Sequence, residues 1–176
     1  YKVHESYVRY CDVITTNSFG CTLQALQKSN IQNYRDVMVS KACDIARKAA
    51  SATQDRALLV AGSLGPLGEC YLDDCPNELA LEEEYGKLIR LLVTGGVDFI
   101  ICETMSSYKE ASCACRQVRN IAPQKLLWVS FTLDDTLPRV TDHHVYQPCI
   151  LRSGESLEVA IRGLINDLGE SSLWAV

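Results

Sequence analysis

Packing alone does not explain why a carboxylate, Glu103, stands at the end of an apolar run. It follows the apolar run VDFII, residues 97–101, and stands between Cys102 and Thr104. A carboxylate removed from water costs several kcal/mol unless a cation or hydrogen-bond donors meet it, and no lysine or arginine lies within this run. Either N–H groups of the loop backbone or the positive group of a ligand must therefore pair with the Glu103 carboxylate. The second alternative predicts a binding site.

Hydroxyl and amide groups end the other apolar runs. Thr16 and Asn17 follow the first run, Ser63 ends the second, and Ser130 lies near the end of the fourth. Such groups orient polar ligands through hydrogen bonds, yet the same residue types also make ordinary turns. The glycine-rich stretch at residues 62–68 fits either a close approach to a ligand or a tight loop.

No metal site is predicted from the residues themselves. Asp142, His143, His144 and Cys149 have the right donor types for zinc, but adjacent histidines in an irregular segment rarely converge on one metal. The chain has nine cysteines, and their spacing includes no CxxC pair typical of a zinc knuckle. We expect most of them to be small buried hydrophobic residues in a reducing compartment.

Five short apolar runs are predicted to form the strands that position these groups. Each is too continuous for a half-exposed strand, so each should be covered on both faces, as in a parallel sheet. Helical patterns separate the runs, which predicts successive right-handed βαβ units. The runs comprise residues 12–17, 57–63, 97–104, 126–132 and 172–176.

The helical segments carry clear boundary signals. In residues 78–93, Leu81, Tyr85 and Leu88 share one face, and two glycines follow the end. Ser107 with Glu110 three residues later is a capping-box pattern. Further helices are predicted from residue 3 to 11, from 37 to 51, and after a cap at Ser156.

The polar strand ends favour a (β/α)8 TIM barrel over a doubly wound sheet. A barrel gathers its chemistry on the C-terminal rim from many strands, whereas a doubly wound sheet concentrates it at one switch point. No GxGxxG or GxxxxGK motif suggests a nucleotide site. A whole barrel takes about 250 residues. We therefore expect residues 1–176 to form a single α/β domain with about five βα units, incomplete at both ends.

Charge and hydropathy exclude some partners. The net charge of -5 and the lack of a basic run argue against nucleic acid and anionic membranes. No stretch has the roughly 18 apolar residues of a membrane span, and the N-terminus lacks a signal-peptide layout. We expect a cytoplasmic protein with a small neutral or cationic partner.

Six segments, in order and spacing, resemble motifs of the homocysteine S-methyltransferase family. They read VHESYV, DVITTNSF, VAGSLGPLGECYL, GGVDFIICETMSSYKEA, WVSFTL and LRSGESLEVAI. The resemblance implies a (β/α)8 barrel in which the thiolate of homocysteine attacks the methyl group of a sulfonium donor. S-methylmethionine and S-adenosylmethionine are such donors, and methionine would be the product. Zinc would bind and deprotonate the thiol.

The same resemblance assigns roles to residues. Glu103 corresponds to the carboxylate that receives the ammonium group of the amino acid. The family's zinc ligands are cysteines in Gly-x-Asn-Cys and Gly-Gly-Cys-Cys motifs, which this sequence lacks, so zinc is implied but its ligands are not in the chain. No catalytic residue is assigned. The implied substrate-binding residues are Glu103, Thr104, Thr16, Asn17, Ser63 and Ser130.

Two rival interpretations stay open. The first is a non-catalytic barrel remnant that acts as a binding or scaffold module. The second is another barrel enzyme acting on a carbonyl or phosphate substrate, which would need a basic residue at a strand end. None of the predicted strand ends has one.

Overall fold

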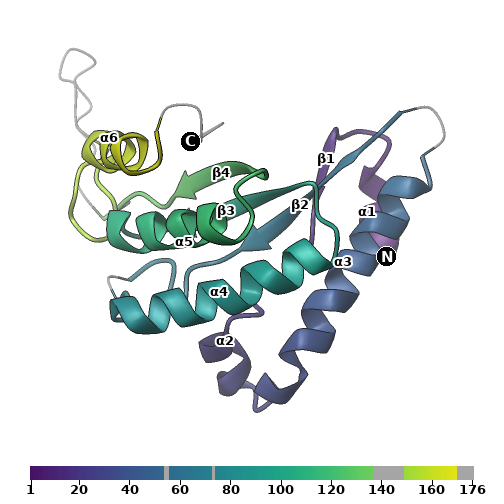
Figure 1. Cartoon of the computed structure of the whole chain (residues 1–176), viewed down its shortest axis with the longest axis horizontal. Coiled ribbons are helices and arrows are strands. Elements are labelled where there is room, and N and C mark those ends of the chain that lie inside the picture. The colour runs from purple at the N-terminus through teal and green to yellow at the C-terminus, as the bar shows by residue number, and fades with distance from the viewer. Residues whose placement is uncertain (54–55, 73, 137–148, 170–176) are drawn as a thin grey trace.

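The fold alternates strands and helices along the chain (Figure 1). The computed structural model describes residues 1–53, 56–72, 74–136 and 149–169. In order, the elements are α1 (Lys2–Tyr7), β1 (Val13–Thr15), α2 (Leu23–Lys28), the 3-10 helix η1 (Gln32–Tyr34), α3 (Arg35–Ser51), β2 (Leu59–Leu64), α4 (Glu78–Thr94), β3 (Phe99–Met105), α5 (Tyr108–Ile121), β4 (Leu126–Phe131) and α6 (Leu157–Leu168).

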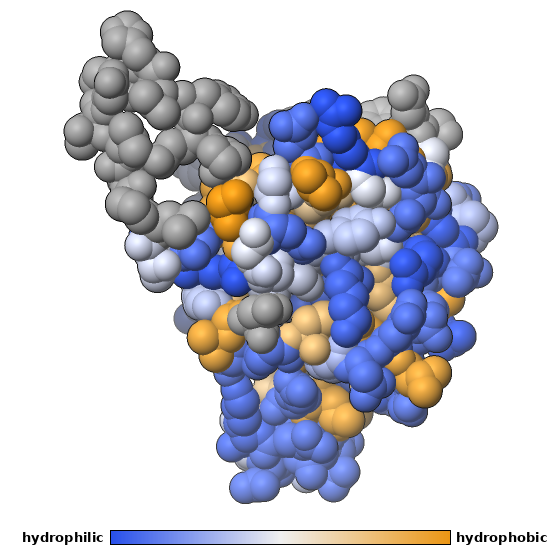
Figure 2. All heavy atoms as spheres, turned by 90° about the vertical axis from the view of Figure 1, so that its left-hand side faces the viewer, coloured by the Kyte–Doolittle hydropathy of each residue, from blue (hydrophilic) through white to orange (hydrophobic). Residues whose placement is uncertain are grey.

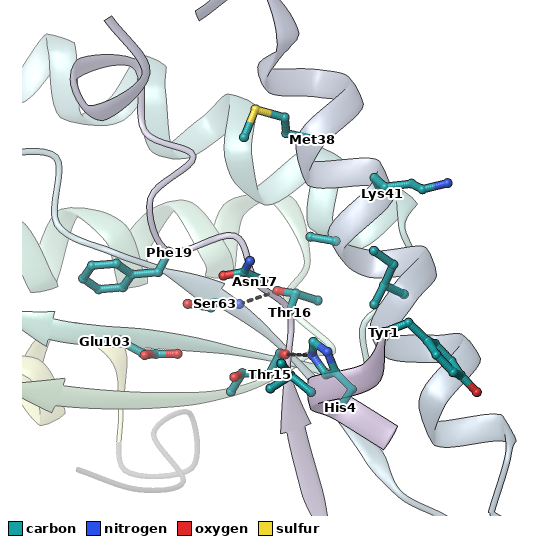
Figure 3. Close-up of a pocket in the computed structure, with 13 residues that line it drawn as sticks. Tyr1, His4, Thr15, Thr16, Asn17, Phe19, Met38, Lys41, Ser63 and Glu103 are labelled. Atoms are coloured by element: carbon teal, nitrogen blue, oxygen red, sulfur yellow. Dashed lines mark hydrogen bonds between the residues drawn. The ribbon is translucent and has the colours of Figure 1, made fainter. Parts of the chain in front are cut away.

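The four strands form one parallel sheet in the order β1-β2-β3-β4. The predicted α/β class with parallel strands is therefore confirmed. The fifth predicted strand, residues 172–176, lies outside the described residues, as do residues 137–148. Because the strands run in the same direction, their polar carboxyl ends meet along one edge of the sheet (Figure 3).

Helices cover one face of this sheet. α3 contacts β1 and β2, α4 contacts β2, and α5 contacts β3 and β4. The strand side chains that point toward these helices are buried, namely Ile14, Val60, Ile100 and Leu127. On the opposite face, Leu59 is 46% exposed and Leu126 is 38% exposed. On the same face Ala61 and Phe99 are buried, so the expectation that both faces are covered holds at these positions and fails at the starts of β2 and β4.

The side of the molecule toward which the strands point is mixed in character. Figure 2 looks onto that side and shows mostly hydrophilic residues, with hydrophobic residues in small separate groups.

The described ends of the segment from residue 134 to 152 lie together, since Leu133 and Leu151 form an antiparallel bridge. Arg152 pairs with Asp135 at 2.9 Å and closes the base of this segment.

The boundaries of α3 and α4 lie within two residues of the prediction, whereas α1 ends at Tyr7 instead of residue 11 and α2 was not predicted. Leu81, Tyr85 and Leu88 are buried on one face of α4, as predicted. A Cβ atom on Gly95, which caps this helix, would lie 2.5 Å from the Cys43 sulfur, so the close packing of α3 requires glycine there. In the described part of the chain, no helix has the length and apolar character needed to cross a bilayer.

The predicted caps are confirmed in position and differ in detail. The Ser107 hydroxyl oxygen accepts a hydrogen bond from the Glu110 N–H at 3.3 Å, which caps α5. The Glu110 carboxylate does not complete a capping box, because it turns toward other partners in the core. Ser156 occupies the N-cap position of α6 without a side-chain capping bond.

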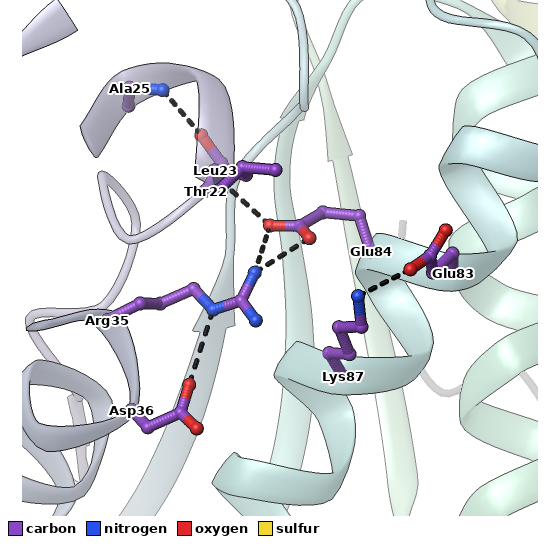
Figure 4. Close-up of polar contacts among 8 residues, drawn as sticks. All are labelled: Thr22, Leu23, Ala25, Arg35, Asp36, Glu83, Glu84 and Lys87. Atoms are coloured by element: carbon purple, nitrogen blue, oxygen red, sulfur yellow. Dashed lines mark hydrogen bonds and ion pairs between the residues drawn. The ribbon is translucent and has the colours of Figure 1, made fainter. Parts of the chain in front are cut away.

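A buried ion pair fixes the segment between β1 and α3 onto α4 (Figure 4). Arg35 Nη1 donates to both carboxylate oxygens of Glu84, at 2.8 and 2.7 Å, and the Leu23 N–H donates to Glu84 at 2.8 Å. The side chains of Arg35 and Glu84 are only 14% and 10% exposed. The neighbouring pair of Glu83 and Lys87 lies on the surface, with Glu83 70% exposed.

Replacing Glu84 by Ala should therefore destabilise the protein far more than the same change at Glu83. Glu84→Ala leaves the Arg35 guanidinium and the Leu23 N–H without their acceptor, which should lower the free energy of unfolding by about 3 kcal/mol. Glu83→Ala removes an exposed i,i+4 pair and should cost about 0.5 kcal/mol or less. Urea unfolding of the intact protein measures both, and equal losses would contradict this account of the segment.

Candidate functional site

A pocket of about 600 Å³ opens at the carboxyl ends of β1, β2 and β3 (Figure 3). Four of the six predicted site residues line it: Thr16, Asn17, Ser63 and Glu103. Side chains from α1 and α3 complete its wall, among them His4, Met38 and Lys41. The structure thus brings residues far apart in the sequence to one cavity, as parallel strand ends should.

Three hydroxyl-bearing residues tie the end of β1 to β2. The Ser63 N–H donates to Thr16 Oγ1 at 3.0 Å, and Ser18 Oγ donates to the Ser63 carbonyl at 2.7 Å. Thr16 Oγ1 and Ser18 Oγ are 2.8 Å apart. Because the Ser18 proton is used toward Ser63, the Thr16 hydroxyl must donate to Ser18. Thr16 therefore holds the pocket wall, and its hydroxyl proton is committed to the protein.

The backbone of Ser63 is hydrogen-bonded on both sides, whereas its side chain is not hydrogen-bonded within the described residues. Ser63 is 2% exposed, and its Oγ has no hydrogen-bond partner among the described residues. A buried hydroxyl without a partner is costly, and such groups in native proteins are uncommon. Ser63 also lines the pocket, so this hydroxyl without a partner lies at the pocket wall.

Glu103 lines the same pocket from β3 and is half-buried. Within the described parts of the chain, its carboxylate makes no ion pair and no hydrogen bond. Lys41 also lines the pocket, but Figure 3 shows its side chain pointing away from Glu103. His4 Nε2 lies 2.9 Å from the Thr15 carbonyl oxygen and so acts as a donor there. Among the described residues, the Glu103 carboxylate is thus a negative group without a partner, and it faces a cavity.

Thr104 and Ser130 do not line this pocket. They contact each other instead, because the Thr104 N–H donates to Ser130 Oγ at 3.0 Å. Thr104 has a φ of +56°, in the left-handed region that β-branched residues rarely adopt. Their predicted role as direct substrate ligands stays a prediction. Ser18 was predicted to be one of the polar residues at the end of the first strand, but no binding role was assigned to it.

The loop after β2 is supported from the core by Glu110. Its Oε1 accepts hydrogen bonds from the Leu67 N–H at 2.7 Å and from the Tyr85 hydroxyl at 2.9 Å. Burial raises the pKa of Glu110, and these hydrogen bonds offset that rise only in part. The carboxyl group therefore anchors the glycine-rich loop that leaves Ser63.

The described residues do not form a metal site. No group of three or more His, Cys, Asp or Glu side chains lies close enough to hold an ion in the part of the chain that the structure describes. Burial raises the pKa of Cys43 and Cys113 to about 11, so neither is a thiolate near neutral pH. As expected, most cysteines are buried: Cys21, Cys43, Cys102, Cys113 and Cys115.

Comparison with known proteins gives a family match over the whole chain. A family model described as homocysteine S-methyltransferase matches residues 1–176. A curated homocysteine S-methyltransferase from Escherichia coli (strain K12) is 33% identical, and the match covers 77% of this chain and 48% of that protein. The chain thus spans about half the length of this relative.

Solved structures share the fold. The oxidized form of the homocysteine methyltransferase MmuM from Escherichia coli matches with a TM-score of 0.77 at 24% identity, covering 98% of this chain and 58% of that one. The metallated form matches with a TM-score of 0.75, covering 94% and 57% of the two chains. The four-stranded parallel sheet described here therefore matches part of a (β/α)8 barrel, which confirms the predicted fold class.

Two serine variants test whether Ser63 is an unsatisfied group held for a ligand. Ser63→Ala should raise the free energy of unfolding of the ligand-free protein by up to about 1 kcal/mol, because it removes a buried hydroxyl that lacks a partner. Ser18→Ala, at similar burial, removes two hydrogen bonds and should lower it by about 1 kcal/mol. Urea unfolding at fixed pH compares them. If Ser63→Ala lowers the free energy of unfolding as much as Ser18→Ala does, the Ser63 hydroxyl is not an unsatisfied group.

Proposed function

Since the chain belongs to the homocysteine S-methyltransferase family, we propose that the intact protein transfers a methyl group to the thiol of homocysteine, giving methionine. The observation that carries this proposal is the unpaired Glu103 carboxylate facing the pocket, beside the unpartnered hydroxyl of Ser63. The ammonium group of an amino acid would neutralise the first group. The carboxylate of the same amino acid would accept a hydrogen bond from the Ser63 hydroxyl.

Five polar residues at the strand ends then have defined tasks in binding. Glu103 fixes the ammonium end through charge-assisted hydrogen bonds, which are stronger than neutral ones. Ser63 orients the carboxylate end, while Thr16 and Ser18 hold the Ser63 backbone in place. Asn17 is exposed at the mouth, where its amide would contact the bound amino acid. With both ends held, the side-chain thiol points in one direction, which is the main requirement for in-line transfer.

We propose a sulfonium compound, S-methylmethionine or S-adenosylmethionine, as the methyl donor. In the reaction, the sulfur of homocysteine forms a bond to the methyl carbon while the bond from that carbon to the donor sulfur breaks. The electron pair of the broken bond stays on the donor, which leaves as a neutral thioether. The thiol proton of homocysteine is released. A cationic donor is compatible with the net charge of -5 on the chain.

Zinc is part of the proposal for the intact protein, with its ligands outside these 176 residues. The described residues do not fit a zinc site, because they contain no suitable cluster of ligands. They supply binding and orientation of the amino acid, and activation of the thiol is left to the rest of the protein. The metallated form of MmuM, which shares this fold, supports looking for a metal.

Replacing Glu103 by Gln tests the substrate assignment. Methionine formation from homocysteine and each sulfonium donor is measured with the intact protein. Glu103→Gln should raise the KM for homocysteine about 10-fold or more, since a hydrogen bond to a charged group contributes about 1.5 to 3 kcal/mol. The matched control is Glu158→Gln, which alters an exposed carboxylate paired with Arg162.

An unchanged KM in Glu103→Gln would remove Glu103 from this role. Intact protein that binds homocysteine yet transfers no methyl group from either donor would instead support a binding module. Failure to bind homocysteine at all would count against both alternatives.

Metal analysis of the intact protein tests the zinc proposal separately. We expect about one zinc per chain and loss of methyl transfer after chelation, with recovery when zinc is restored. Homocysteine methylation that persists in protein shown to be free of metal would be incompatible with zinc dependence.

A further inference from the structure

We propose that Ser130 is a positioning residue that aims Glu103 into the pocket by holding a bulge in β3. This inference rests on the proposed function, because it concerns the same amino-acid site. It assigns to Ser130 an indirect role through the backbone of Thr104, in place of direct contact with the substrate.

The bulge is visible in the register between β3 and β4. Cys102 pairs with Val129, and the next pair is Met105 with Phe131. Three steps along β3 therefore match two steps along β4, so β3 carries one extra residue at Glu103 and Thr104. Bulges are rare in parallel sheets, and they often lie beside active sites, where they redirect a side chain.

The extra residue changes which side of the sheet the next side chain faces. Cys102 is fully buried on the side of the helices, so Glu103 faces the opposite side, toward the pocket. In a regular strand, Met105 would face the same way as Glu103. The bulge instead turns Met105 back to the helix layer, where its sulfur lies 3.9 Å from the Tyr85 hydroxyl of α4. Glu103 can therefore face the cavity while the strand end stays anchored in the core.

The bulge depends on one side-chain acceptor. Thr104 adopts a φ of +56°, which is unfavourable for a β-branched residue, so surrounding contacts must hold it there. Its N–H is displaced from the regular strand pairing and donates to Ser130 Oγ at 3.0 Å. Its hydroxyl donates to the Glu103 carbonyl at 2.7 Å. Without the Ser130 hydroxyl, the Thr104 N–H loses its acceptor and the bulge loses this support.

Binding of two ligands distinguishes positioning from direct contact. Calorimetry with the intact protein compares homocysteine with 4-mercaptobutyrate, which lacks only the ammonium group. Ser130→Ala should weaken homocysteine binding about 2- to 10-fold, the range expected for one hydrogen bond, and leave 4-mercaptobutyrate binding unchanged. Ser130→Thr, which keeps a hydroxyl, should restore the parent affinity. Ser112→Ala controls for loss of a buried hydroxyl outside the pocket, because Ser112 does not line it and bonds to Asp167 on α6.

The proposal also predicts coupling between the two residues. In a Glu103→Gln background, Ser130→Ala should have no further effect on homocysteine binding, since both changes remove the same interaction. Equal weakening of both ligands by Ser130→Ala, or full additivity with Glu103→Gln, would overturn the positioning role.

Crystal structures of the parent and Ser130→Ala proteins give a readout that does not depend on the substrate. We expect Thr104 to leave its left-handed conformation and the Glu103 carboxylate to turn away from the pocket. An unmoved Glu103 overturns the proposal even if homocysteine binds. Conversely, a parent protein that shows no preference for homocysteine over 4-mercaptobutyrate refutes the proposed ammonium site, while a displaced Glu103 in Ser130→Ala still supports the positioning role.

Discussion

A carboxylate inside a protein needs a partner, and this requirement organises the molecule. Glu84 meets it with the guanidinium of Arg35 and thereby attaches the segment after β1 to α4. Glu110 meets it with a backbone N–H and the Tyr85 hydroxyl, and burial shifts its pKa upward. Glu103 has no such partner among the described residues and faces a cavity. The first two acids hold structural elements together, and the third is the one we propose to pair with a ligand.

The pocket gains its rigidity from strand ends instead of mobile loops. Ser63 is held through both its N–H and its carbonyl by Thr16 and Ser18, so its free hydroxyl has a fixed position. Next to Glu103, the Thr104 N–H in the bulge of β3 donates to Ser130 Oγ. In both places, one polar side chain fixes backbone while a neighbouring side chain stays unpaired. Neighbouring polar residues at the strand ends therefore differ in role, because one holds the backbone and the other has no partner among the described residues.

The sequence predicted the fold better than the contacts within the site. Continuous apolar runs and glycine stops located the strands and α4, because local burial patterns depend on residues near in sequence. The rim position of Glu103 followed from the same reasoning. The bulge at Thr104 was not predictable, since it arises from pairing between β3 and β4. Likewise, the hydroxyl of Thr16 suits a ligand or a neighbour equally well, and only the fold shows that Ser18 and Ser63 lie within reach.

The order of the strands in the sheet has a consequence for how the chain folds. In the described sheet, each strand from β2 to β4 pairs with the strand immediately before it in the sequence. Each of these pairings closes one crossover connection, and the entropic cost of closure grows only slowly with the length of that connection. A nascent polypeptide can add one βα unit after another as it leaves the ribosome. The edge that carries Glu103 can therefore grow by one strand end at a time.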